Sequence, residues 1–153
     1  MLRKLIATDD DVASLVLRVF LGIVFFAHGA QLALGWFGGH GFAATMQVFT
    51  QSMHILAVFA FLAIMAQFLG SLGLIVGLLT RVAAFGIGVV MLVATVMVHL
   101  PVGFFMNWFG NQKGEGYEYH LLAIAICIAL MIKGGGKLSI DRALTVKTPA
   151  ARP

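Results

Sequence analysis

The sequence predicts an all-α integral membrane protein, a bundle of four helices that each cross the bilayer. Its 153 residues are 61% hydrophobic and only 10% charged, and the mean hydropathy is +1.01. A soluble domain is typically about 45–50% apolar and about 25% charged, so this chain has too little charge to cover a water-facing surface. Composition therefore excludes a soluble enzyme and a disordered chain, and the single Cys127 excludes a disulfide scaffold.

Four stretches are long and apolar enough to cross. A crossing helix needs about 20 apolar residues, because the hydrocarbon core is about 30 Å thick and a helix rises about 1.5 Å per residue. The four predicted spans are residues 12–34, 55–79, 82–100 and 117–135. The last is strictly apolar only from Leu121 to Ile132 and needs flanking residues to cross. We assign residues 1–144 to one domain, and the segment after Asp141, which leads into a tail at 145–153, is expected to be disordered.

The basic residues indicate the orientation. One side of the predicted bilayer holds Arg3, Lys4, Arg81, Lys133, Lys137, Arg142, Lys147 and Arg152, whereas the other side holds only Lys113. Because Lys and Arg concentrate in cytoplasmic loops, we predict that both termini face the cytoplasm. The basic residues are scattered rather than gathered in one stripe, which indicates topology and not a nucleic-acid partner.

The ends of the spans carry further signals. Three aspartates at residues 9–11 precede the first span, where a cleaved signal peptide avoids acid, so the first span is expected to be retained. Thr80 and Arg81 are expected to form a tight turn, which makes spans two and three antiparallel neighbours. Within span two, Gly73 and Gly77 form a GxxxG pair, and small residues of this kind predict a helix contact in the bundle or in a dimer.

Two polar residues lie inside the predicted spans. Arg18 is six residues into span one, where a charged side chain is costly. It could extend its charge to the inner phosphates or bind a substrate or partner. Gln67 lies near the midplane of span two and could hydrogen-bond to another helix.

Histidines and glutamates concentrate on one side. In the predicted orientation, every one of them lies on the extracytoplasmic half: His28, His40, His54, His99, His120, Glu115 and Glu118. Histidine titrates near neutrality and ligates metals, so such a set could bind a metal, a haem or a quinol head group, although interfacial histidines are also tolerated without a function.

These alternatives differ in what they require. Haem would need His28 and His99 at matched depth, and a metal site would use His99, Glu118 and His120. A quinone site needs apolar walls, aromatic rings and a proton-handling group. We therefore predict a quinone as the cofactor and no metal or haem, with Glu118, His120 and His28 as the catalytic candidates. His28, His99, Phe105 and Trp108 are the candidates for binding the quinone.

Several short motifs, taken in order, resemble the DoxX family of small bacterial membrane proteins. They comprise residues 18–22 with Phe25, His28 and Gly29, then residues 70–81, 103–108, 114–120 and 134–141. The resemblance covers about residues 12–144. It implies a four-helix membrane subunit tied to redox enzymes, such as thiosulfate:quinone oxidoreductase. The family often has Glu at the position of Gln67, so a proton path through the midplane is not implied here.

Two functions follow as hypotheses. The first is a membrane subunit of a redox complex, at most one subunit of a quinone-linked oxidoreductase, that interacts with quinone at the extracytoplasmic polar cluster. The alternative is a non-catalytic membrane anchor or assembly subunit that packs against a larger partner. Both predict contact with the lipid bilayer and with other protein subunits or a second copy of the chain.

Overall fold

The computed structural model describes residues 2–145, and this part of the chain is helical with no β-strand. Its elements are α1 (Leu2–Leu5), α2 (Val12–Leu34), α3 (Gly41–Gln47), the π-helical η1 (Val48–Ser52), α4 (Ala57–Val76), α5 (Thr80–Ala94), the π-helical η2 (Thr95–His99), α6 (Glu118–Lys133) and α7 (Ile140–Thr145). The prediction of an all-α protein is confirmed.

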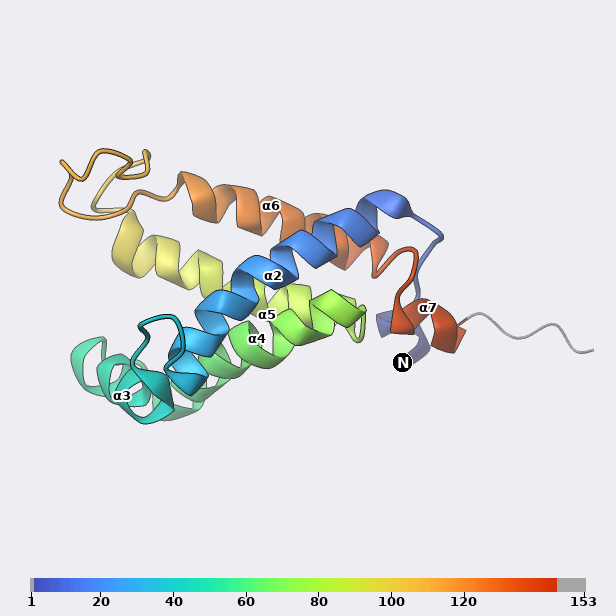
Figure 1. Ribbon diagram of the computed structural model, residues 1–153, viewed down its shortest axis with the longest axis horizontal. Helices are drawn as coiled ribbons and strands as arrows, with labels where there is room; N and C mark the ends of the chain where they lie inside the picture. The colour runs from blue at the N-terminus through green and yellow to red at the C-terminus, as the bar shows by residue number, and fades with distance from the viewer. Residues whose placement is uncertain (1, 146–153) are drawn as a thin grey trace, which may run out of the picture.

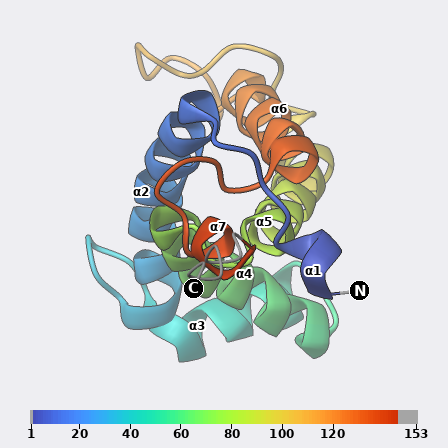
Figure 2. The ribbon, with the colours of Figure 1, turned by 90° about the vertical axis from the view of Figure 1, so that its right-hand side faces the viewer.

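The long helices α2, α4, α5 and α6 lie side by side along the long axis of the molecule (Figure 1). Helix α4 packs against α2 and α5, and α6 packs against α5 and α2, so the four form a ring when seen from one end (Figure 2). Their inward faces meet in an apolar core that contains Leu21, Phe25, Leu74, Ala84, Ile87, Met91, Ala123, Cys127 and Leu130.

The outward faces of the bundle are also apolar. Large hydrophobic side chains such as Phe20, Phe59, Phe85 and Leu122 are exposed on all four long helices. A soluble protein would not expose so much apolar surface, so these faces contact the lipid bilayer. Among residues 2–145, three helical segments are long and apolar enough to cross a membrane, namely α2, α4 and α5 continued by η2.

Helix α6 is shorter than the predicted fourth span. It has 16 residues, which corresponds to a length of about 24 Å, less than the hydrocarbon thickness of about 30 Å. Gly134 ends it, with φ at +82°, a conformation that L side chains rarely adopt. The helix therefore ends two residues before residue 135, the approximate end predicted for the fourth span.

The connection between α4 and α5 differs from its prediction. The turn between α4 and α5 comprises residues 77–79, whereas Thr80 and Arg81 already belong to α5, so the predicted turn is displaced. Gly77 ends α4 in the left-handed conformation that allows this early reversal. The connection between α2 and α4, which lies outside the predicted spans, contains the short helices α3 and η1.

The segment after Asp141 also differs from its prediction. Residues 140–145 form α7, because Asp141 and its backbone bond to the α4–α5 turn, so the predicted disorder is wrong up to Thr145. The remainder of the predicted tail lies outside the described residues.

The two ends of the bundle differ in chemistry. Helices α1 and α7 and the α4–α5 turn lie together at one end (Figures 1 and 2), which we call the basic end because it carries Arg3, Lys4, Arg81, Lys133, Lys137 and Arg142. The opposite end comprises α3, η2, the loop 100–117 and the start of α6, and we call it the histidine end. The two ends of the described chain therefore lie on the same side of the bundle.

Small residues allow the closest helix crossings. A Cβ atom built at Gly29 would lie 2.6 Å from backbone atoms of Gln67 and Phe68, so α2 and α4 touch there through their main chains. Of the two glycines in the predicted GxxxG pair, Gly73 packs closely against the carbonyl oxygen of Leu78 and near Ala83 on α5. Gly77 instead packs against Ser139 and the guanidinium of Arg18, so the predicted GxxxG face is a helix contact only at Gly73.

Candidate functional site

Arg18 is buried at the basic end, with 1% of its surface exposed. Its Nη1 donates to the carbonyl oxygens of Leu74 at 2.9 Å and Ile75 at 2.6 Å, at the end of α4. Its Nε donates to the carbonyl oxygen of Gly135 at 2.8 Å, and its Nη2 donates to that of Leu138 at 2.7 Å. The guanidinium therefore does not extend to phosphates, but joins α4 to the segment between α6 and α7.

Asp141 is buried beside this centre and closes the α4–α5 turn. Its carboxylate accepts hydrogen bonds from the N–H groups of Leu79 at 2.7 Å and Thr80 at 2.9 Å, which are unpaired donors at the start of α5. Its own N–H donates to the carbonyl oxygen of Gly77 at 2.9 Å. Asp141 thus acts as an N-cap supplied by a distant part of the chain.

The start of α2 is fixed to the same end. Asp11 caps the helix, and the hydrogen bond from the Ser14 hydroxyl, together with those from the Ser14 and Ala13 N–H groups, lowers the pKa of the Asp11 carboxyl. The N–H of Lys137 donates to the Asp11 carbonyl oxygen at 3.0 Å. The polar groups at the basic end therefore bond mainly to one another and to the backbone, an arrangement that stabilises the fold.

At the histidine end, two of the predicted site residues, His99 and His120, are in contact. The ring centroids of His99 and His120 lie 4.0 Å apart, with the rings inclined by 39°. The π-helical turn η2 ends at His99, and π-helical turns of this kind often occur at functional sites. His120 is 6% exposed, and its Nδ1 is buried without a hydrogen-bond partner in the described part of the chain.

The tautomer of His99 follows from its partner. Its Nδ1 lies 2.8 Å from the carbonyl oxygen of Glu115, and a carbonyl can only accept a hydrogen bond. Nδ1 therefore carries the hydrogen, which leaves Nε2 of the neutral ring as an acceptor. Of the two rings, His120 thus supplies the buried nitrogen, Nδ1, that has no hydrogen-bond partner among the described residues.

His28 and two aromatic residues extend this cluster. The rings of Phe25 and His28 lie 6.2 Å apart, and those of Phe25 and Tyr119 lie 6.4 Å apart and are stacked. The Tyr119 hydroxyl is buried and, like His120 Nδ1, has no partner among residues 2–145. His28 itself is exposed on the outer face of α2. We call His28, His99, Tyr119 and His120 the histidine cluster.

The predicted carboxylates lie beside the histidine cluster but are engaged in the loop. Glu118 accepts from the N–H of Met106 at 3.2 Å, and Glu115 accepts from that of Asn107 at 2.7 Å. Glu118 therefore holds loop 100–117 against the start of α6, whereas Glu115 joins two parts of the loop itself. Within the described residues, no group of three or more His, Cys, Asp or Glu side chains could hold a metal ion.

Phe105 and Trp108 are placed differently from the histidines. Phe105 packs on Phe104, and Trp108 is 80% exposed on the loop 100–117. No aromatic contact in the described part of the chain connects either residue to the histidine cluster. Tyr119, by contrast, was missed, although its position between Glu118 and His120 was a sequence signal for it.

Comparison with known proteins gives the family. The sequence model of the DoxX family matches residues 13–100, which is more than half of the chain. The chain belongs to the DoxX family. The matched range includes Arg18, His28 and His99 of this DoxX protein and ends before Glu118 and His120. The family match and the long apolar helices both show that the chain is a membrane protein.

A bacterial relative extends the match. An uncharacterized protein of Haemophilus influenzae is 27% identical over 140 residues, which is 90% of this chain and 87% of the relative. The similarity therefore extends beyond the range matched by the family. No solved structure matches this DoxX protein with significance.

Proposed function

We propose that this DoxX protein is a membrane subunit of a redox complex that binds a quinol head group at the histidine cluster. The observation that carries the proposal is the contact of His99 with His120, whose Nδ1 is buried and unpaired within the described chain. A buried polar atom without a partner is costly, so a bound polar group at this place would remove the cost.

The residues present fit such a head group. The exposed ring of His28, the partly exposed Tyr119 and the apolar helix faces offer aromatic and apolar contact, and the buried Phe25 packs behind the two rings. When bound, the quinol supplies two electrons and two protons as it is oxidised to quinone. The ring nitrogens of His99 and His120 that carry no hydrogen would accept the protons, because each neutral imidazole has one acceptor nitrogen. The electrons would pass to a redox centre on a partner subunit, so the proposal includes a complex.

The proposal also includes the topology. We propose α6 as a fourth crossing helix, with both termini in the cytoplasm of a bacterial inner membrane. Support comes from the basic end, where seven described Lys and Arg residues lie, the buried Arg18 included, compared with Lys113 alone at the histidine end. The histidine cluster would then lie at the extracytoplasmic surface, where protons leave the membrane.

Quinone content tests the proposal. Wild type and variants are purified from native membranes in mild detergent, and the lipid extract is assayed for quinone per protein. We expect His99→Gln and His120→Gln to lower quinone content and quinol-linked turnover severalfold. His40→Gln and His54→Gln are matched controls, because both residues lie at the same end of the bundle and belong to no described cluster.

Equal quinone content and turnover in all four variants would contradict quinone binding at the histidine cluster. Glu118→Gln separates positioning from proton transfer. If Glu118 only holds the loop through Met106, the variant retains quinone content and turnover, because the amide oxygen of Gln still accepts that hydrogen bond.

A second candidate, the anchor or assembly subunit, is favoured by the exposed aromatic tip of loop 100–117. Trp108 is 80% exposed and Phe109 is 91% exposed, and such a surface suits a partner subunit. If this is the function, Trp108→Ser with Phe109→Ser abolishes co-purification of the partner, whereas the histidine variants retain both partner and activity.

A further inference from the structure

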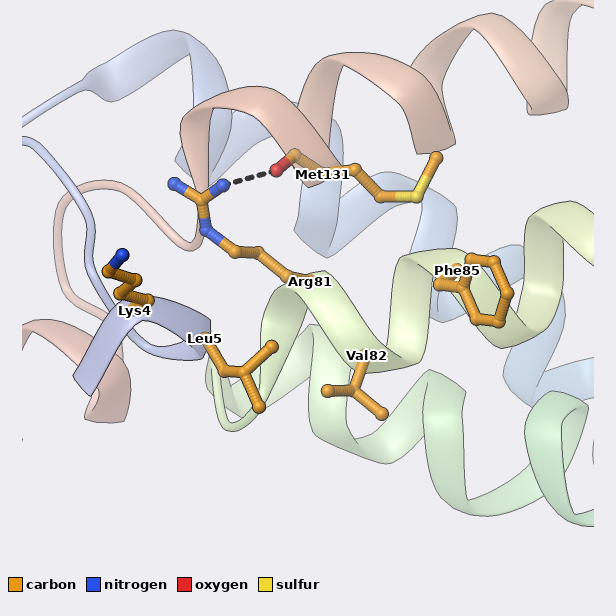
Figure 3. A pocket seen from close by; sticks show the side chains of 6 residues that line it. All are labelled: Lys4, Leu5, Arg81, Val82, Phe85 and Met131. Atoms are coloured by element: carbon orange, nitrogen blue, oxygen red, sulfur yellow. Dashed lines mark hydrogen bonds between the residues drawn. The ribbon is translucent and has the colours of Figure 1, made fainter. Parts of the chain in front are cut away.

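A hollow of about 470 Å³ opens at the basic end, beside α1, α5 and α6. Its lining residues are Lys4, Leu5, Arg81, Val82, Phe85 and Met131 (Figure 3). In this view the charged groups of Lys4 and Arg81 lie at one side, and the Phe85 ring and the Met131 thioether lie at the other. The hollow therefore has a positively charged mouth and an apolar wall.

A second hollow, of about 170 Å³, continues this surface along α5 and α6. It shares Phe85 and Met131 with the first, and it is lined by apolar side chains, Gly88 and Cys127 as far as Leu92. Leu92 lies 11 residues beyond Arg81, which corresponds to about 16 Å along a helix. We call the two hollows together the α5–α6 groove. It leads from the charged mouth toward the middle of the apolar zone.

The charges at the mouth are not neutralised within the described residues. The Arg81 guanidinium donates from Nε and Nη2 to the Ala7 carbonyl oxygen and from Nη1 to that of Met131, so two of its five N–H groups remain. In residues 2–145, no carboxylate lies within ion-pair distance of Arg81 or Lys4, and the Lys4 ammonium makes no hydrogen bond. The backbone thus orients a cation that still lacks a counter-ion.

We propose that the α5–α6 groove binds an anionic phospholipid. Its phosphate lies between Lys4 and Arg81, and one acyl chain lies along the groove toward Leu92. A guanidinium with two free N–H groups suits phosphate oxygens, and basic pockets between helices at the membrane surface recognise anionic head groups. A soluble phosphate would use only the mouth, whereas a lipid uses the charged mouth and the apolar groove together.

A tryptophan reporter tests the site. Phe85→Trp is made in a chain that carries Trp36→Phe and Trp108→Phe, and the protein is reconstituted into vesicles of brominated phosphatidylglycerol or brominated phosphatidylcholine, whose bromines quench tryptophan. We expect the reporter to prefer phosphatidylglycerol severalfold. Phe20→Trp is the matched control, because Phe20 on α2 is 67% exposed and Phe85 is 60% exposed. It should show no preference.

Charge variants test whether the basic residues at the mouth of the α5–α6 groove select the anionic lipid. Lys4→Gln should lower the preference for phosphatidylglycerol about fivefold, the effect of one basic residue near a membrane surface, whereas Lys113→Gln at the histidine end should not change it. Inorganic phosphate in the buffer should not displace the lipid. Equal quenching by both lipids, no effect of Lys4→Gln, or displacement by phosphate alone would each overturn the proposal. The site lies at the opposite end from the histidine cluster, so its test is independent of quinone binding.

Discussion

The Nη1 of Arg18 donates to the carbonyl oxygen of Leu74 at 2.9 Å, and this bond joins the second turn of α2 to the last turn of α4. Carbonyl groups at a helix end have no partner within the helix and carry the negative end of its dipole. A buried guanidinium is stabilised there without a carboxylate in direct contact. Arg18 therefore occupies a site formed by the end of α4 and the segment between α6 and α7.

Replacement of Arg18 should destabilise the fold strongly. Arg18→Lys should lower the free energy of unfolding by at least about 2 kcal/mol, because one ammonium cannot reach carbonyl groups on two segments and several would lose their donor. Unfolding in detergent checks this. Arg142→Gln is the control, since its ion pair with Asp10 is partly exposed and should contribute less than about 1 kcal/mol. Equal losses in both variants would contradict the assigned role of Arg18.

Asp141 gives a second stability prediction. Asp141→Asn should cost about 1–2 kcal/mol, because the amide can accept from only one of the two N–H groups, those of Leu79 and Thr80. Hydrogen exchange at the Thr80 amide should also be faster in this variant than in wild type. Asp9→Asn, which removes a charge without a described side-chain contact, should leave both measurements unchanged. Slow exchange at Thr80 in Asp141→Asn would show that the cap does not depend on the carboxylate.

The helix crossing at Gly29 predicts a steric effect. Gly29→Ala should destabilise the bundle by about 1–3 kcal/mol, because the added methyl group meets the α4 backbone at 2.6 Å. Gly70→Ala is the matched control, since its Cβ would lie 3.8 Å from Ala83, an ordinary contact. Thermal unfolding of the two variants should therefore separate them. Two equal melting temperatures would mean that α2 can move away from α4 without cost.

Cysteine labelling tests the proposed topology. In a chain with Cys127→Ala, a cysteine is placed by Lys113→Cys or by Arg142→Cys and exposed to a membrane-impermeant maleimide on intact cells. We expect Lys113→Cys to react directly, and Arg142→Cys to react only after the membrane is permeabilised, because these residues lie at opposite ends of the bundle. If both cysteines react on intact cells, or if neither reacts, the chain does not cross the membrane an odd number of times between residues 113 and 142, and the proposed topology is wrong.

The sequence alone determined the class of protein and its first helix. Twenty-three consecutive apolar-rich residues must form a helix in lipid, because no other local structure satisfies their backbone groups, and the predicted span 12–34 coincides with α2. The concentration of histidines toward one end also followed from depth along each helix. Composition and helical rise are local properties, so no tertiary contact was needed to predict them.

Tertiary structure alone decided the role of the polar residues. The position of Arg18 within the first helix was evident in the sequence, but its partners come from residues 74–75 and 135–138, far along the chain, so its burial could not be predicted. The contact of His99 with His120 likewise depends on the π-helical turn η2 and on how α5 packs against α6. A hydrogen bond or a ring contact needs two groups within a few ångströms, and only the packing of distant helices fixes which groups meet.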